Sequence, residues 1–264
     1  MEDQTLEAFA ALVRTVSELR GPGGCPWDRR QTHQSLKRYA IEETYEVVDA
    51  IESAAADRLE DELGDLLLQV LLHAQIARES GEFDIAGVCG RINEKLRRRH
   101  PHVFGGLEVD GVDEVLHNWE QIKRAEPGNE DRSSVLDGVP RSLPALMRAE
   151  KLSKKAARTG FDWPNVEAIV DKLREETAEL EEAVREGDHD RTAAEIGDIL
   201  FTVVNIARFQ QVDPEEALRG MLDRFAARFR VIETRAAQEG RSVQDMTLDE
   251  MDRVWEEAKR TNPD

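Results

Sequence analysis

The sequence predicts an all-α protein built from two copies of one helical unit. Three observations support this fold class. The helix formers Ala, Leu, Glu and Arg dominate the composition, whereas aromatic residues make up only 5%. Apolar residues recur at helical spacing, and no segment has the alternating pattern of a half-buried strand. The two halves of the 264-residue chain also carry the same motifs in the same order.

The duplicated motif is a set of acidic residues at fixed spacing. EETYE is followed after 15 residues by ELGD in the first half, and EETAE is followed after 15 residues by EIGD in the second. The chain's four tryptophans take equivalent places around these motifs: Trp27 and Trp163 upstream, Trp119 and Trp255 downstream. We therefore expect a unit at residues 1–125, a Pro-, Gly- and Ser-rich linker at 126–142, and a second unit at 143–264.

Helices are predicted in chain order within the second unit. An amphipathic helix opens it at ALMRAEKLSKKAA, the counterpart of ALVRTVSELR near the start of the chain. Residues 166–187 repeat apolar residues at helical spacing and end at a glycine, which is a typical stop. Residues 191–211 are apolar nearly all round, so we expect this helix to be buried. Residues 214–240 begin with a proline, which suits the first turn of a helix.

The charge and composition exclude several classes of protein. A net charge of −19 repels nucleic acid and anionic membranes, so we expect no direct nucleic-acid binding. No apolar run is long enough for a transmembrane helix, and the acidic N-terminus is unlike a signal peptide. The two cysteines, Cys25 and Cys89, fit neither a disulfide framework nor a metal knuckle. A cytoplasmic location is therefore expected.

The acidic motifs raise the question of what balances their charge. EETAE by itself is typical of a solvated helix face, although like charges three or four residues apart repel. Glu195 and Asp198, however, lie in an apolar helix, where a carboxylate needs a cation or a proton. An Arg or Lys partner, or a polar stripe that emerges at the protein surface, is one interpretation. The identical spacing in both copies favours the other, a metal site between two antiparallel helices.

All-oxygen ligation without His or Cys suits a hard cation, so we expect Mg²⁺, with Mn²⁺ as a possible substitute. The predicted ligands are Glu176, Glu179, Glu195 and Asp198, with Glu43, Glu46, Glu62 and Asp65 as their first-copy equivalents. Gly64 and Gly197 stand between the paired acids, and we expect them to allow a neighbouring helix to approach closely.

Cationic residues near the acids point to a phosphate-bearing substrate. Lys172 lies one turn before the acidic motif, and Arg224 and Arg228 are four residues apart on the next long helix. Trp255 and Lys259 form a WxxxK motif that occurs in both copies. This motif is interpreted either as a stacking platform with a phosphate contact, or as a tryptophan that caps the core beside a solvated lysine. Both interpretations stay open.

Together these motifs resemble the MazG family of nucleoside triphosphate pyrophosphohydrolases, in its two-unit form. The markers are EExxE and ExxD separated by 15 residues, GGCPWD, RRRHPHVFG and VWEEAKR, and they span essentially the whole chain. The resemblance implies an all-α fold whose units pair into a helical bundle, commonly in a homodimer. It also implies Mg²⁺-dependent hydrolysis of NTPs and dNTPs to the monophosphate and pyrophosphate.

The resemblance also implies roles for particular residues. The metal would be held by Glu176, Glu179, Glu195 and Asp198, and the nucleotide by Lys172, Arg224, Arg228, Trp255 and Lys259. Arg224 stands where the family pattern has Lys, which keeps the charge but changes the phosphate geometry. The C-terminal unit tends to be catalytic in two-unit relatives, yet the first acidic motif is complete here.

The mechanistic hypothesis is in-line attack of water on the α-phosphorus. We expect Glu175 and Glu176 to be catalytic, Glu175 as the base and Glu176 as a metal ligand. A ferritin-like di-iron protein is disfavoured because neither copy has a Glu-x-x-His motif. A non-enzymatic acidic helical adaptor is the alternative function, and it leaves the repeated ExxD sets in apolar helices unexplained.

Overall fold

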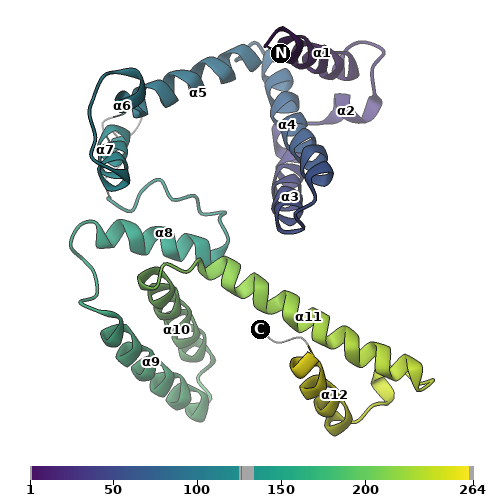
Figure 1. Ribbon diagram of the computed structural model, residues 1–264, viewed down its shortest axis with the longest axis vertical. Helices are drawn as coiled ribbons and strands as arrows, with labels where there is room; N and C mark the ends of the chain where they lie inside the picture. The colour runs from purple at the N-terminus through teal and green to yellow at the C-terminus, as the bar shows by residue number, and fades with distance from the viewer. Residues whose placement is uncertain (1, 125, 127–133, 262–264) are drawn as a thin grey trace. The chain divides into compact units, whose positions relative to one another are not determined.

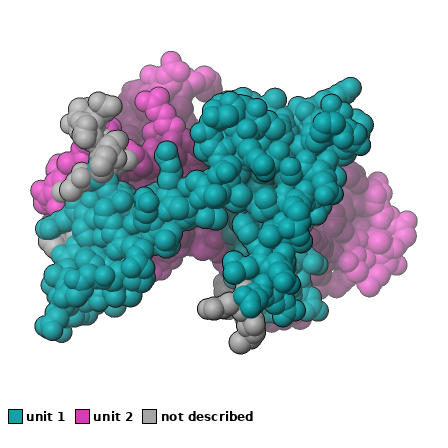
Figure 2. Space-filling view, turned by 90° about the horizontal axis from the view of Figure 1, so that it is seen from above, with its two compact units in different colours: residues 1–129 teal, residues 130–264 magenta. Residues whose placement is uncertain are grey.

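The computed structural model describes residues 2–124, 126 and 134–261 (Figure 1). All regular structure in these residues is helical, which confirms the all-α prediction. The chain divides into two compact units, residues 1–129 and 130–264 (Figure 2). Much of the predicted linker, residues 127–133, lies outside the described residues, so its boundaries stay a prediction.

The first unit is centred on a pair of long helices. Helix α3 packs along α4, and α1 covers α4 from another side (Figure 1). Their shared core consists of Val16, Leu36, Leu71, Leu72 and Ile76. The helices of this unit are α1 (Glu2–Arg20), α2 (Pro26–Arg30), α3 (His33–Glu52), α4 (Ala56–Glu79), α5 (Ile85–Arg99), α6 (Pro101–Phe104) and α7 (Val112–Arg124).

The second unit contains two helical hairpins. Helix α9 packs on α10, and α11 packs on α12 (Figure 1). Helix α8 contacts α10 and α11. The core of the α11–α12 hairpin is formed by Ile232, Ala236, Met246 and Val254. The helices here are α8 (Ala145–Ala157), α9 (Val166–Glu186), α10 (His189–Phe209), α11 (Pro214–Gln238), the 3₁₀ turn η1 (Val243–Asp245) and α12 (Leu248–Thr261).

Local capping explains where the second-unit helices begin and end. The Asn165 side chain accepts a hydrogen bond from the Ala168 amide at 2.9 Å and starts α9. The helix ends at Gly187, whose φ of +72° is the left-handed conformation that favours glycine. Asp188 then caps α10, and Pro214 occupies the first turn of α11. The predicted helices of the second unit and the residues at which they start and end are therefore confirmed.

The expectation that α10 is buried all round is wrong. Its exposed fractions are 46% at Ile196, 49% at Leu200 and 44% at Val203. Helices α8 and α9 cover only part of its circumference, and α11 contacts it weakly. A β-carbon at Gly197 or Gly64 would meet no atom of a neighbouring helix within 4 Å, so the predicted close helix approach does not occur among the described residues.

No helix in the described part of the chain is long and apolar enough to cross a membrane.

Candidate metal and nucleotide site

Three carboxylates converge in the second unit. Glu176 and Glu179 lie on α9 and Glu195 on α10, and each offers an oxygen within 4.8 Å of the others. The i,i+3 spacing places the first two on one face of α9, and the packing of α10 against α9 brings Glu195 opposite them. Partial burial, followed by repulsion from Glu195 and Glu176, raises the pKa of Glu179. The group therefore concentrates negative charge between two helices.

Two cations flank this group. Lys172 Nζ lies 2.7 Å from Glu175 and 2.9 Å from Glu176, and these carboxylates raise the pKa of Lys172. Arg191 Nε lies 3.6 Å from Glu195. The side chains of Glu176 and Glu195 are only 8% and 13% exposed. The basic partners expected by the non-metal interpretation are thus present.

The donor set nevertheless fits a hard divalent cation. The three clustered carboxylates provide oxygen ligands, and Lys172 divides its charge between Glu176 and Glu175, which lies outside the cluster. Burial, and then repulsion from Glu195 and Glu176, still raise the pKa of Glu179 in spite of Lys172. A divalent ion would offset this repulsion more fully than the shared lysine does.

Two predicted members of the site lie outside the cluster. Asp198 is exposed and is not among the three clustered side chains. Glu175 is 58% exposed and accepts a hydrogen bond from Lys172. The structure therefore brings together three of the four predicted ligands in this unit. The predicted base, Glu175, is connected to the cluster only through Lys172, which contacts both Glu175 and Glu176.

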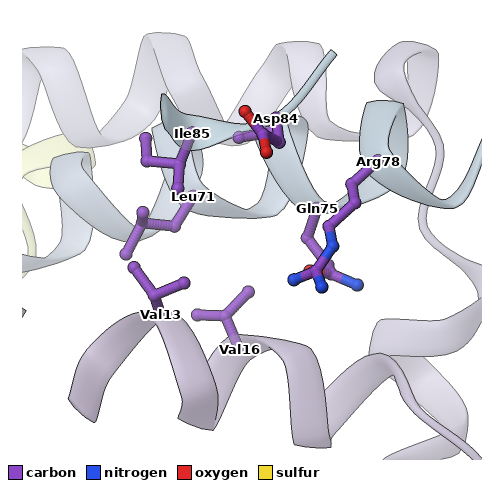
Figure 3. A pocket seen from close by; sticks show the side chains of 8 residues that line it. Val13, Val16, Leu71, Gln75, Arg78, Asp84 and Ile85 are labelled. Atoms are coloured by element: carbon purple, nitrogen blue, oxygen red, sulfur yellow. The ribbon is translucent and has the colours of Figure 1, made fainter. Parts of the chain in front are cut away.

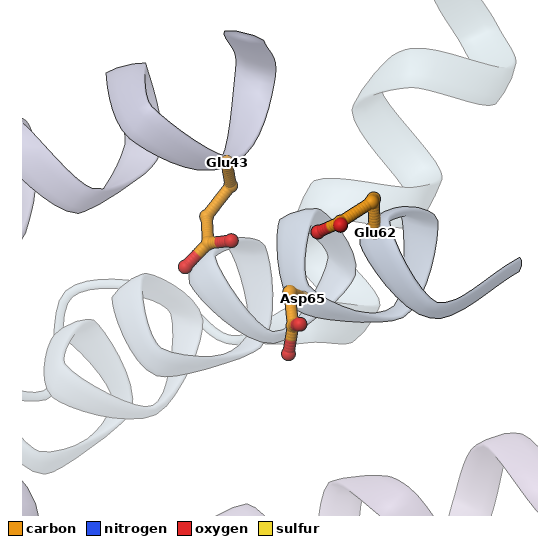
Figure 4. Close-up of side chains that lie close together, drawn as sticks. All are labelled: Glu43, Glu62 and Asp65. Carbon is orange, nitrogen blue, oxygen red and sulfur yellow. The ribbon is translucent and has the colours of Figure 1, made fainter. Parts of the chain in front are cut away.

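The first unit contains an equivalent acidic group with different membership. Glu43 on α3 meets Glu62 and Asp65 on α4, again within 4.8 Å (Figure 4). Burial and then repulsion from Asp65 raise the pKa of Glu43. Glu46 is outside the group but is close enough to contribute to raising the pKa of Glu43. Each of the four motif positions thus joins a cluster in at least one copy.

Four of the five predicted nucleotide-binding residues lie on another hairpin, and the fifth, Lys172, lies on α9 beside the acids. Arg224 and Arg228 belong to α11, and Trp255 and Lys259 to α12. Among the described residues neither helix contacts α9 (Figure 1). One copy of the chain therefore does not bring these side chains to the second-unit acids.

The contacts of Trp255 and Lys259 match one of the two open interpretations. Trp255 packs against the α11–α12 core, with its ring centroid 5.3 Å from that of Phe225. Lys259 Nζ lies 2.7 Å from Glu256, and both side chains are about half exposed. In this state the tryptophan caps the core and the lysine is at the surface.

Sequence reasoning missed a polar group further along α10. Asn205 is only 3% exposed although it lies in the apolar stretch VVNIA. The first copy has Leu72 at the equivalent place, ten residues after the ExxD glutamate. A position-by-position comparison of the two copies contains this signal.

Comparison with known proteins agrees with the duplication. Residues 31–104 and 165–230 each match the MazG nucleotide pyrophosphohydrolase domain. The two segments include both carboxylate groups together with Arg224 and Arg228, whereas Trp255 and Lys259 lie beyond the second one.

Relatives resemble the chain over nearly its whole length. It is 44% identical to the nucleoside triphosphate pyrophosphohydrolase of Escherichia coli K12 over 256 residues, which cover 96% of this chain and 97% of that protein. It is 44% identical over 251 residues to the Thermotoga maritima nucleoside triphosphate pyrophosphohydrolase/pyrophosphatase MazG, with 95% of each chain covered. Identity to the Bacillus subtilis protein YabN is 52% over 254 residues, but the chain spans only 52% of that protein's length. The chain belongs to the MazG family and carries its domain twice.

Proposed function

We propose that this protein is a nucleoside triphosphate pyrophosphohydrolase of the cytoplasmic nucleotide pool. It cleaves NTPs and dNTPs between the α- and β-phosphates, giving the monophosphate and pyrophosphate. The observation that carries the proposal is the group of three carboxylates on α9 and α10, which lies within a segment that matches the MazG domain. The names of the E. coli and T. maritima relatives support the same reaction.

The metal in this proposal is Mg²⁺, for which Mn²⁺ can substitute. Glu176, Glu179 and Glu195 hold it in the second unit, and Asp198 joins them after a rotamer change. The equivalent first-copy ligands are Glu43, Glu46, Glu62 and Asp65. When bound, the ion neutralises phosphate charge and acts as a Lewis acid toward the phosphate oxygens.

Lys172 links substrate binding to the base. Lys172 Nζ donates a hydrogen bond to Glu175 at 2.7 Å, so the lysine ammonium balances the charge of this carboxylate before substrate arrives. A phosphate that binds Lys172 releases Glu175, which then accepts a proton from water. The water oxygen bonds to the α-phosphorus as the bond to the bridging oxygen breaks, and pyrophosphate leaves.

We further propose that two copies of the chain complete each site. The acids lie on α9 and α10, whereas Arg224, Arg228, Trp255 and Lys259 lie on α11 and α12, which do not contact α9 in one chain. Exposed apolar side chains on α10 and α11 offer a surface for a partner. They include Ile196, Leu200 and Val203 on α10, and Leu218, Met221 and Leu222 on α11.

Mixing two inactive variants tests this arrangement. Glu176→Ala removes an acid and Lys259→Ala removes a cation from the opposite hairpin. If each site combines two chains, the refolded mixture recovers about a quarter of wild-type activity, because half the dimers contain one intact site of two. Activity that never recovers, or a monomer in sedimentation experiments, would refute the shared site.

Pyrophosphate release tests the proposed activity. The purified protein is expected to release pyrophosphate from NTPs and dNTPs with Mg²⁺ and not with EDTA. Glu176→Ala is compared with the matched first-unit variant Glu43→Ala, and loss in the first variant alone assigns catalysis to the second unit. No release from any of the eight common nucleotides would favour the acidic adaptor instead.

A further inference from the structure

An open hollow of about 540 Å³ lies in the first unit against α2 and the beginning of α3. Its lining joins the aromatic residues Trp27 and Tyr39 to the basic residues Lys37 and Arg38, with three neutral polar residues and no carboxylate. Aromatic surface with a few polar groups, in a volume of this order, is typical of small-molecule sites. Neither Glu43 nor any residue of α4 lines the hollow, so it is separate from the first-unit acidic group.

The hollow is positively charged although the protein is strongly acidic. Residues 27–39 include four basic side chains and one acidic one, whereas the whole chain has a net charge of −19. Lys37 and Arg38 are exposed, and neither forms an ion pair with a carboxylate of the described residues. Basic side chains without carboxylate partners attract an anion, over about 8 Å at physiological ionic strength. The charge of the lining therefore favours an anionic ligand.

Hydrogen bonds hold the two sides of the hollow together. Gln31 Nε2 donates to the Trp27 carbonyl at 3.1 Å, and Gln31 Oε1 accepts from Ser35 Oγ at 2.7 Å, so one side chain connects α2 to α3. Arg20 Nη1 donates to the backbone carbonyls of Asp28 and Gln31, and the Arg20 side chain is only 5% exposed. The walls are therefore in place before a ligand binds, which lowers the entropic cost of binding.

Trp27 provides aromatic surface that the protein does not cover. The residue is 51% exposed, and its ring meets that of Tyr39 edge to face, with the centroids 5.8 Å apart. Arg38 lies over the Tyr39 ring, with its guanidinium carbon 4.5 Å from the centroid, and donates a hydrogen bond to the tyrosine hydroxyl. Because an edge-to-face contact uses at most one face of the indole, a flat ring can stack on the other.

The second copy does not reproduce this basic face. Counting from the EExxE motifs, Val170 stands at the place of Lys37. Asp171 stands at the place of Arg38, and its carboxylate pairs with Arg174 at 2.6 Å. The segment that joins α8 to α9 forms no helix, so α2 has no counterpart in the second unit. The two copies therefore share the acidic motif but not the hollow.

Two other hollows of the first unit lack this combination of side chains. A pocket between α1, α4 and α5, lined by Val13, Leu71, Asp84 and their neighbours, encloses only about 40 Å³, which is room for water (Figure 3). The hollow lined by residues 14–24 is larger, but it contains Glu18 and no aromatic side chain. Of the three, the hollow at α2 and α3 alone joins aromatic rings to cations and excludes carboxylates.

We propose that the hollow at α2 and α3 binds a nucleoside polyphosphate without a metal ion. The base stacks on Trp27, and Lys37 and Arg38 contact the phosphates. The lining has no carboxylate that could hold a metal or accept a proton from water, so the ligand is bound here and not hydrolysed. The site uses none of the clustered acids, and it is therefore independent of the proposed function.

Binding measured in EDTA tests this site, because the acidic groups are then without metal. Equilibrium dialysis is expected to show that ATP binds at least about tenfold more tightly than inorganic triphosphate or adenosine, since only ATP uses both the aromatic ring and the cations. The affinity for ATP is expected to fall as salt is added, because salt screens the exposed cations. Equal affinity for ATP and triphosphate, or no binding of ATP, would overturn the proposal.

Substitutions separate the two kinds of contact. The double variant Lys37→Val with Arg38→Gln is expected to weaken ATP binding at least about tenfold, and an unchanged Tm checks that it folds. Trp27→Ala is expected to weaken ATP binding about tenfold and to change triphosphate binding less than about threefold. Trp27→Phe keeps an aromatic ring and is expected to restore most of the affinity. Variants that all bind ATP like the wild type would overturn the proposal.

Lys172→Ala is the matched control in the second unit, where Lys172 contacts two of the motif glutamates. This variant is expected to bind ATP in EDTA as the wild type does. A loss of binding in Lys172→Ala, with none in the first-unit double variant, would assign the binding to the second unit and overturn the proposal. Pyrophosphate release with Mg²⁺ tests the proposed function separately.

Discussion

Replacing Glu195 with glutamine removes one negative charge from the second-unit cluster and hardly changes the side-chain volume. Glu195 has an oxygen within 4.8 Å of one on Glu176, and its side chain is 13% exposed. Without metal these two carboxylates repel each other, whereas with metal both are proposed ligands. The substitution is therefore expected to have opposite effects on stability in the two conditions.

The magnitude follows from the separation. At 4.8 Å the repulsion of two unit charges is about 0.9 kcal/mol in water and about 3.5 kcal/mol at an effective dielectric constant of 20. Glu179 repels Glu195 across the same limit of 4.8 Å and doubles this value, whereas the lost attraction of Arg191 at 3.6 Å is about 1.2 kcal/mol in water and about 4.6 kcal/mol at a dielectric constant of 20. The net gain is therefore about 0.5–2 kcal/mol. We expect Glu195→Gln to stabilise the metal-free protein by about 1 kcal/mol, or roughly 2–4 °C in Tm.

Thermal unfolding with EDTA and with Mg²⁺ measures both effects. Mg²⁺ at a hundred times its Kd stabilises the wild-type protein by about 2.7 kcal/mol, and the variant loses most of this gain. The order of the two Tm values therefore reverses between the conditions. The metal assignment would be refuted by a variant that is less stable than the wild type in EDTA. It would also be refuted by a variant whose Tm rises on addition of Mg²⁺ as much as the wild-type Tm does.

The first copy provides a matched control. Glu62 has Arg58 at 3.5 Å and is 17% exposed, much like Glu195. Glu62→Gln is expected to raise the metal-free Tm similarly and to leave pyrophosphate release intact if the second unit is catalytic.

Three further predictions concern the base, the core and pH. Glu175→Gln is expected to lower kcat at least about tenfold with unchanged nucleotide affinity, and full turnover in this variant would exclude Glu175 as the base. Ile169 is fully buried, so Ile169→Ala is expected to destabilise the protein by about 2–4 kcal/mol in urea unfolding, against little change for the 60%-exposed Val184→Ala. Arg241 and the Thr247 amide lower the pKa of Glu250 from 4.5 to about 2. This depressed pKa contributes stability above pH 4.5 that is lost as the pH falls toward 2. The free energy of unfolding of Arg241→Gln is therefore expected to change less with pH between pH 4.5 and pH 2 than that of the wild type. An unchanged slope of the free energy of unfolding against pH would contradict the assignment.

The sequence predicted the helices of the second unit well because their signals are local. The side chains of Asn165 and Asp188 accept hydrogen bonds from the backbone amides that follow them. Gly187 adopts the left-handed conformation because it is a glycine, without help from residues distant in sequence. The acidic spacing likewise predicted the three carboxylates that meet in each unit, although it predicted a fourth that lies outside. Residues three apart share a helix face whatever surrounds the helix.

Side-chain burial and membership of the site were less predictable. The apolar composition of α10 predicted burial, but coverage depends on which helices pack against it, and part of its surface stays exposed. Asp198 and Glu46 have the correct spacing yet lie outside their clusters. Asn205 was missed because a single asparagine in an apolar run carries no periodic signal.

The sequence by itself therefore determined the helical class, the duplication, the helix ends and the acidic motifs, since all of these depend on residues close together along the chain. Only the tertiary structure decided that three carboxylates cluster in each unit, and that Arg224, Arg228, Trp255 and Lys259 lie on a different hairpin from the second-unit acids. These features depend on contacts between residues far apart in sequence, which helical periodicity does not encode.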